Sequence, residues 1–540
     1  MRELLTRIDP SKLYLAAGPR QLETLAGLLE PRVDSEALSH DSGLLADSVL
    51  AYCGTTVLEN QEVRRLVIEL LPREELSALA EKLTGRSYEK PHDNALIMAK
   101  RPWRSSNRLV LELADRLGIE RRFLPTSSLM SPSIEFIEPV EALPPLLDYQ
   151  QSLKELILEA LDRGDESFAV QLPTGAGKTR TVLDALVEHF VSRSLFLDGR
   201  SLVWLAHTEE LCEQAIDTFK DLWRHLGSDT VRVVRLWGNH SAKEWDLDSA
   251  FVVAGVSKLS RLADSSDRRF VALIDSTEAV VIDEAHKATA PTYRNTIAKI
   301  REGRNPTVIG LTATPGRGLG SIDENRELAS LFGRRLLRPD LGPEPVQRLR
   351  EEGVLAQLDR RCVESRVQLE LQSSESEQSD LPARLLRRLA ESVPRNKLLL
   401  DLIQDEVSEG NPVLVFACTV EHSRVLAAAL NIKGCRSAYV DCQMDRGSRR
   451  HAVDQFRSGE IDVLINFGVL STGFDAPRTR TVVIGRPTSS VVLYSQMIGR
   501  GLRGPRVGGT ERCKLIDIRD NYLNFGDVED VYEAFSGYWS

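Results

Sequence analysis

The sequence has 540 residues, of which 42% are hydrophobic and 27% charged, and its formal net charge is -10 at pH 7. This length is too great for one hydrophobic core, so several domains are expected. The negative charge excludes binding of nucleic acid by overall attraction, so a polyanion would have to be held by a local groove. We find no apolar run that could cross a bilayer and no leader at Met1, which predicts a cytoplasmic protein without a membrane partner.

The first 145 residues have the spacing of amphipathic helices. Leu109, Leu113 and Leu117, for example, recur at helical intervals. A proline-rich join over 139–145 ends this part. We therefore predict a mainly helical domain over 1–145. It carries no evident chemistry, and docking of a partner protein is one possible role.

From residue 146 onward, short apolar runs alternate with amphipathic stretches. Runs of this kind, bounded by helices, indicate parallel sheets that are covered on both faces. They fall into two series, which are 168–172, 202–206, 251–254, 280–282 and 308–311, and then 413–416, 437–440, 463–465 and 482–484. The predicted fold class is α/β, with two tandem domains over 146–345 and 346–540.

A candidate phosphate-binding loop, Gln171-Leu-Pro-Thr-Gly-Ala-Gly-Lys-Thr179, lies between an expected strand and an expected helix. Gly175 and Gly177 let the backbone curl, so that N–H groups point at phosphate oxygens. Lys178 would neutralise the β and γ phosphates of ATP, and the hydroxyl of Thr179 would bind Mg²⁺. The residues expected to contact the nucleotide here are Thr174, Gly175, Ala176, Gly177, Lys178, Thr179 and Arg180.

This loop departs from the general signature at one position, because Leu172 stands where the signature has its first glycine. An ordinary turn is the alternative for Gly-Lys-Thr alone. The strand-to-helix context and the two elements that follow favour a nucleotide site.

The second element is an apolar strand that ends in two carboxylates and a histidine, Val280-Val-Ile-Asp-Glu-Ala-His286. Ligands of such sheets bind beyond the carboxyl ends of the strands, where these side chains emerge. Asp283 can hold Mg²⁺, and Glu284 can orient and deprotonate the attacking water. An acidic surface loop is the alternative reading of Asp-Glu alone, and the nearby phosphate loop disfavours it.

The third element, Gln496-Met-Ile-Gly-Arg-Gly-Leu-Arg503, lies in the second α/β domain. Arg500 and Arg503 are three residues apart, which would place them on one face of a helix, and guanidinium groups suit the charge of a transferred phosphoryl group. The second domain has no phosphate loop of its own. We therefore predict that Gln496 and the two arginines complete the site of the first domain across the interface.

The ordered set of motifs resembles that of the superfamily 2 helicases and translocases of the DEAD/DEAH-box group, DEAH type. It extends from about residue 146 to 524. The further matching segments are Leu147-Asp-Tyr-Gln150, Leu205-Ala-His-Thr-Glu-Glu-Leu211 (motif Ia), Gly255-Val-Ser-Lys-Leu259 (Ib), Leu311-Thr-Ala-Thr-Pro315 (III), Val415-Phe-Ala-Cys-Thr419 (IV) and Ser471-Thr-Gly-Phe-Asp-Ala-Pro477 (V). The resemblance implies two RecA-like domains and an ATPase that depends on nucleic acid.

The resemblance also implies roles for individual residues. Gln150 would read adenine, and Gly473 and Asp475 would contact the nucleotide from the second domain. The coupling of hydrolysis to cleft closure would fall to His286, Thr312 and Thr314. The residues implied in contacts with the nucleic-acid backbone are Thr208, Ser257, Thr419 and Thr472.

The motif variants indicate the substrate. Thr-Ala-Thr-Pro together with Asp-Glu-Ala-His resembles the DNA-acting groups, including type I restriction motor subunits and excision-repair helicases, so DNA is favoured over RNA. We find no convincing nuclease signature. The prediction is an ATP-dependent DNA helicase or translocase, which by analogy would serve bacterial DNA repair or anti-phage defence. The alternative is a nucleotide-controlled clamp or sensor on DNA or RNA that recruits a partner protein.

Two aromatic segments lie outside these motifs. Lys100-Arg-Pro-Trp-Arg104 combines cations with an aromatic ring, as nucleic-acid contacts do, although a solvated loop is the commoner reading. The aromatic residues near the C-terminal end are expected to pack on the second α/β domain. They are Tyr532, Phe535, Tyr538 and Trp539.

Overall fold

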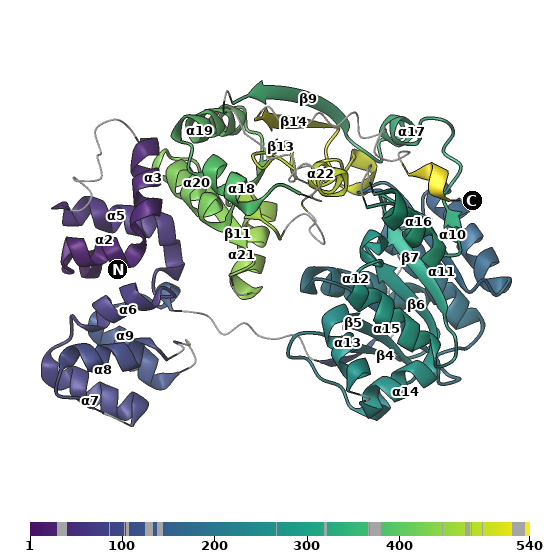
Figure 1. The fold of residues 1–540 in the computed structure, drawn as a ribbon, viewed down its shortest axis with the longest axis horizontal. Coiled ribbons are helices and arrows are strands. Elements are labelled where there is room, and N and C mark those ends of the chain that lie inside the picture. Colours follow the sequence, from purple (N-terminus) through teal and green to yellow (C-terminus); the bar gives the residue numbers. More distant parts are fainter. Residues whose placement is uncertain are drawn as a thin grey trace.

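The computed structural model in Figure 1 has three parts, a helical N-terminal domain and two α/β domains. None of the described helices combines the length and the apolar character needed to cross a membrane. The residues that the structure describes are 1–29, 40–85, 87–101, 103, 107–124, 133–137, 144–265, 267–317, 321–365, 367, 380–444, 446–469, 476, 478–488, 490–520 and 535–539.

The N-terminal domain is helical, as predicted. Its helices are α1 (Arg2–Thr6), α2 (Pro10–Ala17), α3 (Pro19–Leu29), α5 (Ser42–Cys53), α6 (Gln61–Ile68), α7 (Arg73–Thr84), α8 (Pro91–Ala99) and α9 (Arg108–Leu117). They enclose a core of their own that includes Leu113 and Leu117, whose spacing predicted α9. The core is separate from those of the two α/β domains, so this part is built as a domain.

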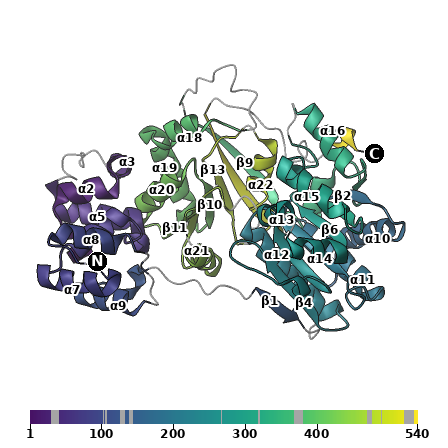
Figure 2. The same cartoon turned by 60° about the horizontal axis from the view of Figure 1, so that its bottom comes forward.

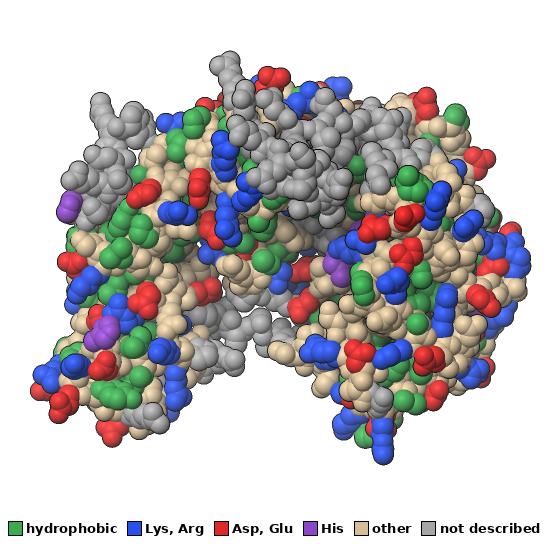
Figure 3. All heavy atoms as spheres, viewed as in Figure 1, with side chains coloured by type: hydrophobic (Ala, Val, Ile, Leu, Met, Phe, Trp, Pro, Cys, Tyr) green, Lys and Arg blue, Asp and Glu red, His purple; other side chains and the backbone are tan. Residues whose placement is uncertain are grey.

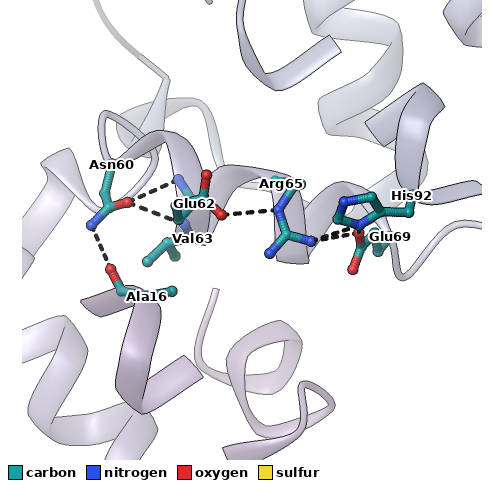
Figure 4. A network of polar contacts seen from close by, with 7 residues as sticks. All are labelled: Ala16, Asn60, Glu62, Val63, Arg65, Glu69 and His92. Atoms are coloured by element: carbon teal, nitrogen blue, oxygen red, sulfur yellow. Dashed lines mark hydrogen bonds and ion pairs between the residues drawn. The ribbon is translucent and has the colours of Figure 1, made fainter. Parts of the chain in front are cut away.

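A polar network ties three helices of this domain together (Figure 4). Asn60 caps α6 by accepting hydrogen bonds from the backbone of Glu62 and Val63, and its amide donates to the carbonyl of Ala16 in α2 (2.9 Å). Along α6, Glu69 lies 2.6 Å from Arg65 and 2.8 Å from His92 at the start of α8. The network thus fixes α6 against α2 on one side and α8 on the other.

The N-terminal domain packs on the second α/β domain, although the first follows it in the chain. Helices α3 and α5 contact α20 (Val420–Ile432), and both views place them side by side (Figures 1 and 2). Leu25, Leu28 and Tyr52 are buried in the same apolar cluster as the side chains of α20. Because this contact is apolar and buried, we expect the N-terminal domain to move with the second α/β domain.

The first α/β domain contains a twisted sheet in the order β1-β4-β5-β3-β6-β7-β2-β8, which is parallel except for β1. Its strands are β1 (Ile134–Ile137), β2 (Ser167–Gln171), β3 (Ser201–Ala206), β4 (Val231–Leu236), β5 (Ala250–Gly255), β6 (Thr277–Asp283), β7 (Thr307–Thr312) and β8 (Leu336–Leu337). The five strands predicted from apolar runs are all confirmed. Strands β1, β4 and β8 were not predicted.

Helices cover both faces of this sheet, as its continuous apolar strands require. The helices that share a core with one face are α10 (Asp148–Asp162), α11 (Lys178–Ser192) and α12 (Glu209–Leu226). Those that share a core with the other face are α13 (Val256–Asp264), α14 (Arg268–Ser276), α15 (Pro291–Arg301) and α16 (Ile322–Leu331). Strand β1 lies inside the range 1–145 that was predicted to be a helical domain, but it extends this sheet antiparallel to β4.

The second α/β domain has a parallel sheet in the order β11-β12-β10-β13-β14-β9. Its strands are β9 (Gln357–Glu364), β10 (Val413–Phe416), β11 (Ser437–Asp441), β12 (Val463–Phe467), β13 (Thr481–Ile484) and β14 (Arg512–Arg519). Helices α19 (Val393–Ser408) and α20 share a core with one face, and α21 (Arg446–Ser458) and α22 (Val491–Ile498) with the other. The predicted pair of tandem parallel-sheet domains is confirmed.

The two α/β domains are in contact. The residues that connect them include α17 (Pro345–Glu351), and the buried side chains of Val346 and Leu355 belong to an apolar cluster that also contains residues of both domains. Residues of α21 and α22 belong to the same cluster, so this face of the second sheet lies on the side of the first domain.

The C-terminal aromatic residues pack on the first α/β domain, so the prediction that they pack on the second is wrong. Phe535 is fully buried against Gly316, and the indole N–H of Trp539 donates to the carbonyl of Pro315 (2.8 Å). Tyr532 lies outside the described residues. Local sequence could not predict this contact, because it joins residues more than two hundred positions apart.

Candidate nucleotide-binding site

The phosphate-binding loop connects β2 to α11, as predicted. Gly175 and Gly177 have φ angles of +90° and +85°, which other residues adopt only with strain, and Gly177 is the N-cap of α11. The side chain of Lys178 is partly buried, and its ammonium group donates to the carbonyls of Leu172 (3.2 Å) and Pro173 (3.4 Å). Burial lowers the pKa of Lys178 from its usual value, which a bound phosphate would reverse.

The first turn of α10 contacts this loop. The hydroxyl of Tyr149 and the amide of Gln150 both donate to the carbonyl of Ala176, at 2.9 Å and 3.2 Å. A Cβ atom on Gly177 would collide with the amide of Gln150. Gln150 and Tyr149 therefore both lie against the phosphate loop, whereas the reading of adenine by Gln150 stays a prediction.

Asp283 and Glu284 lie at the carboxyl end of β6 and are 6% and 9% exposed. Glu284 has a φ angle of +53°, a strained conformation for a residue with a side chain, and such strain is typical of functional sites. Burial and the charge of Glu284 raise the pKa of Asp283. Burial alone would also raise the pKa of Glu284, but His286, Lys178 and Arg500 hold it below its usual value. Glu284 is thus the carboxylate that stays ionised.

A contact between motif Ia and the end of the segment Val280–His286, which we call motif II, was not predicted. The ammonium group of Lys287 lies 2.6 Å from Nε2 of His207, and His286 Nδ1 lies 3.4 Å from a carboxylate oxygen of Glu284. Burial lowers the pKa of both histidines to about 4, so both are neutral at pH 7. A polar chain thus runs from Glu284 toward motif Ia. The His-Lys pair lies eighty positions apart and has no local sequence signal.

Motif III lies next to the phosphate loop. The hydroxyl of Thr312 donates to the carbonyl of Thr314 (2.7 Å) and accepts from its N–H (3.1 Å), which braces the loop internally. The amide of Gln171, at the end of β2, donates to the carbonyl of Ala313 (3.4 Å). The loop is therefore tied to the strand that leads into the phosphate site, a geometry suited to the coupling role that the resemblance implied.

The segment Gln496–Arg503 of the second domain, which we call motif VI, packs directly against the phosphate loop. A Cβ atom on Gly499 would collide with the methyl group of Thr174, so the two segments are as close as backbone allows. The side-chain Cγ of Arg503 lies 3.9 Å from the position of a Cβ on Gly175. The charge of Arg500 affects the pKa values of both Lys178 and Glu284. The arginines thus face the phosphate loop, as predicted.

The arginines do not share a helix face, however, and that prediction is wrong. Helix α22 ends at Ile498, Arg500 lies in the turn that follows, and Arg503 forms an isolated antiparallel bridge with Leu355. Glycines at 499, 501 and 504 allow this segment to pack closely against its neighbours. Gln496 lies inside α22 and is buried, and its amide nitrogen has no hydrogen-bond partner among the residues the structure describes.

The two domains enclose an open cleft of about 1380 Å³ that holds these groups. It is lined by residues of both domains, including Lys178, Thr179 and Glu284 of the first and Arg500 and Arg503 of the second. The cleft continues past the phosphate loop to an ion pair that joins the domains, in which Arg449 of α21 lies 2.6 Å from Glu210 of α12. An ATP molecule bound to the loop would therefore lie between two domains.

Magnesium fits the oxygen donors in this cleft. The hydroxyl of Thr179 and the carboxylate of Asp283 both line it, and Asp283 is buried near the cation of Lys178, whose single charge balances only part of the negative charge of a nucleotide. Oxygen ligands of this kind suit Mg²⁺, which takes its remaining ligands from phosphate and water. This arrangement can bind ATP, activate water and stabilise the charge of a transferred phosphoryl group.

Two of the residues predicted to contact nucleic acid cap helices. Thr208 caps α12 by accepting from the N–H of Leu211, and Thr419 caps α20 by accepting from that of His422. Ser257 lies in the first turn of α13. Thr472, Gly473 and Asp475 lie outside the described residues.

The basic segment of the N-terminal domain is partly a core element. Trp103 is 3% exposed and Arg64 lies over its ring at 5.7 Å. This ring cannot stack on a base, so the nucleic-acid reading of 100–104 is not supported at Trp103. Basic and acidic side chains are interspersed over the face shown in Figure 3, consistent with a local rather than a global attraction for a polyanion.

Comparison with known families agrees with this geometry. Residues 144–317 match the family model described as "Type III restriction enzyme, res subunit", and residues 394–504 match that of the helicase conserved C-terminal domain. The two segments make up just over half of the chain. The first contains the phosphate-binding loop and motifs Ia, Ib, II and III, and the second contains motifs IV, V and VI. The chain belongs to the superfamily 2 helicases.

This helicase has relatives among characterised sequences and structures. It is 26% identical over 436 residues to the IRC3 protein of Saccharomyces cerevisiae, named as a candidate ATP-dependent helicase; the match covers 75% of this chain and 58% of that protein. It is also 26% identical to the pre-mRNA-splicing ATP-dependent RNA helicase PRP28 of Yarrowia lipolytica. That match covers 62% of this chain and 56% of PRP28. Among solved structures, that of the DUF1998 helicase MrfA bound to DNA is similar, with a TM-score of 0.49 and 16% sequence identity. The similarity covers 75% of this chain and 53% of the MrfA chain. The helicase thus spans little more than half the length of these proteins.

Proposed function

We propose that this helicase couples ATP hydrolysis to movement along DNA. The observation that carries the proposal is the contact of Gly499 with Thr174, which places motif VI of one domain against the phosphate loop of the other. A protein that only binds nucleotide can build the whole binding site within one domain. A site assembled from two domains can instead be opened and closed by whatever binds across both.

The chemistry follows from the groups in the cleft. Lys178 and the N–H groups of the loop would hold the phosphates, and Thr179 and Asp283 would hold the magnesium ion that neutralises phosphate charge. Glu284, ionised and held in a strained backbone conformation, would position the attacking water and accept its proton. Arg500 and Arg503 would stabilise the charge that develops on the γ-phosphoryl group.

Turnover would then depend on nucleic acid. In the proposed cycle a strand bound across both domains draws Arg500 into place, and hydrolysis releases it again. The polar chain from Glu284 through motif II to His207 of motif Ia would report the state of the nucleotide to the strand. Gln150 would select adenine, and Thr208, Ser257, Thr419 and Thr472 would hold the backbone.

The choice of DNA over RNA is supported by the Thr-Ala-Thr-Pro and Asp-Glu-Ala-His variants of motifs III and II. A role in DNA repair or anti-phage defence is proposed by analogy with the groups that share these variants. The relatives include proteins named as RNA helicases, so the experiment must include both polymers.

The test is steady-state ATP hydrolysis with single-stranded DNA, duplex DNA and single-stranded RNA of matched length. We expect DNA to raise kcat by at least about tenfold and RNA to raise it less, with stimulation that weakens as salt increases because phosphate contacts release counterions. Equal rates with and without all three polymers would overturn the proposed function. Stronger stimulation by RNA would overturn the substrate.

Strand displacement on tailed duplexes separates a motor from a nucleotide-controlled clamp. A motor displaces the strand in proportion to ATP consumed. A clamp hydrolyses ATP on DNA without displacement or movement, and the N-terminal domain would then be the candidate platform for a recruited protein.

A further inference from the structure

The C-terminal segment 535–539 contacts motif III of the other α/β domain. In the chain it follows β14, the last strand of the second domain, yet it packs on the first domain through the 3-10 turn Ser536–Tyr538, which contacts α16. The indole N–H of Trp539 donates to the carbonyl of Pro315 at 2.8 Å. Pro315 and Gly316 directly follow Thr314, one of the residues implied in coupling.

Gly316, which follows Pro315, lacks a side chain and so leaves room for Phe535. The ring of Phe535 is fully buried against Gly316, and a Cβ atom at that position would collide with the ring. A side chain at 316 and the aromatic ring at 535 therefore exclude each other. Gly316 has no positive φ angle that would require glycine, so close approach is the reason for glycine here.

A second contact reaches from Trp539 to the strands behind the site. The ring of Trp539 is stacked near Phe332, with centroids 6.4 Å apart and planes 26° apart. Phe332 is itself fully buried against Gly310 of β7, where a Cβ atom would lie 2.6 Å from its ring and 2.9 Å from Cβ of Ala285. The aromatic pair thus lies behind both the strand of motif III and the alanine of Asp-Glu-Ala-His.

The loop is held from other directions by the catalytic elements. Gln171 donates to the carbonyl of Ala313 on the side of the phosphate loop. Arg317 donates to the hydroxyl of Thr289 (3.0 Å), just after motif II. Pro315 and Gly316 lie between these two attachments in sequence, and Trp539 and Phe535 hold this middle part.

We propose that Phe535 and Trp539 are positioning residues that hold the motif III loop in the geometry needed for hydrolysis and for its coupling to the nucleic acid. They touch neither nucleotide nor strand and act through Pro315, Gly316 and Phe332. The coupling part of this inference rests on the proposed function. Loss of the segment leaves the phosphate loop intact, so it lowers turnover rather than the affinity for ATP.

The test compares Trp539→Ala, Trp539→Phe and a chain that ends at residue 534, with Trp245→Ala as the matched control. Trp245 is 65% exposed and lies in a different part of the first domain, so its loss should change no rate. Each protein is assayed for kcat and KM for ATP with and without single-stranded DNA, and for ATP consumed per base pair displaced. Thermal unfolding verifies that each is folded.

We expect Trp539→Ala to lower kcat about three- to tenfold with KM within about twofold of the wild type, as loss of one hydrogen bond and its packing would. Trp539→Phe keeps the ring contact with Phe332 but loses the N–H donor. Its kcat should lie between those of the wild type and Trp539→Ala. Truncation should equal or exceed Trp539→Ala. DNA-stimulated turnover and displacement should fall more than basal turnover.

Rates of Trp539→Ala equal to those of the wild type would overturn the inference, as would an increase in KM that accounts for the whole loss. A wild type that no polymer stimulates overturns the proposed function instead, and the basal kcat-against-KM comparison then decides the positioning role. If Trp539→Ala unfolds, Trp539→Phe decides it in the same way.

Discussion

The two halves of the nucleotide site are built in different ways. In the first domain, Lys178 follows β2 and Asp283 ends β6, two parallel strands of one sheet separated only by β7, so local sequence places both at the same edge. In the second domain, Arg500 follows the end of a helix and reaches the site only because Gly499 packs against Thr174. The first half is complete within its domain. The second half reaches the nucleotide only when the two domains are close together. Binding events that change the distance between the domains can therefore regulate it.

The largest effect should come from the half that performs the chemistry. Replacing Glu284 with Gln removes the base but keeps the shape of the site, so kcat should fall about 10³-fold while ATP binding is retained. Glu278→Gln is the matched control, because Glu278 lies in the same strand with a partly exposed side chain. Steady-state hydrolysis and titration with a fluorescent nucleotide measure the two quantities. A Glu284→Gln variant with more than a tenth of normal turnover would remove this residue from its proposed role.

The half contributed by the second domain should give the next largest effect. Arg500→Ala removes transition-state charge stabilisation and should lower kcat about 10²-fold with little change in nucleotide affinity. Arg512→Ala, an exposed arginine of the same domain, should be neutral. If Arg500→Ala weakened ATP binding as much as it slowed turnover, the arginine would be a ground-state ligand and the comparison of the two halves would fail.

The contact between the halves can be broken without removing a functional group. Gly499→Ala inserts a methyl group where the methyl of Thr174 lies, and should lower turnover about tenfold because the domains can no longer close fully. Thr174→Gly removes both the methyl group and the Cβ atom, which would lie 2.3 Å and 2.5 Å from the new side chain, so the double variant should recover most of the activity. Kinetics of the four proteins in a double-mutant cycle measure this. Additive losses would show that the domains do not meet here during turnover.

The smallest effect should come from the ion pair at the far end of the cleft. Arg449 and Glu210 are partly exposed, so Glu210→Gln should change kcat by less than about fivefold, and less at high salt. Exchanging the two charges should restore the wild-type rate. A loss as large as that of Gly499→Ala would mean that α21 and α12, rather than motif VI, control the approach of the domains.

The sequence predicted the features that depend on contiguous residues. The strands that carry the phosphate loop and Asp283 are continuous apolar runs, and each was confirmed. Strand β4 was not recognised because Arg235 interrupts its apolar pattern; in the fold this arginine is 1% exposed and paired with Glu135 and Glu213. The arginine segment was predicted as a helix from the three-residue spacing of Arg500 and Arg503, but α22 ends at Ile498, and the glycines at 499, 501 and 504 disfavour a helix.

Contacts between distant segments could not be predicted in this way. Helices α3 and α5 pack on α20, more than 360 positions downstream, and Trp539 packs on Pro315. No periodic pattern or motif spacing in the sequence indicates either contact. Apolar side chains such as Leu25 and Trp539 can pack on any apolar surface of suitable shape. The roles of Thr472, Gly473 and Asp475 stay predictions from motif V.

The central claim is that nucleotide and DNA control the same closure of the two domains. Affinity for fluorescent single-stranded DNA, measured with ADP and with ADP plus aluminium fluoride, tests it most directly, because coupling between two sites is reciprocal. We predict that the transition-state analogue tightens DNA binding about tenfold or more in the wild type and has no effect in Arg500→Ala. Equal DNA affinities in both nucleotide states of the wild type would contradict the account.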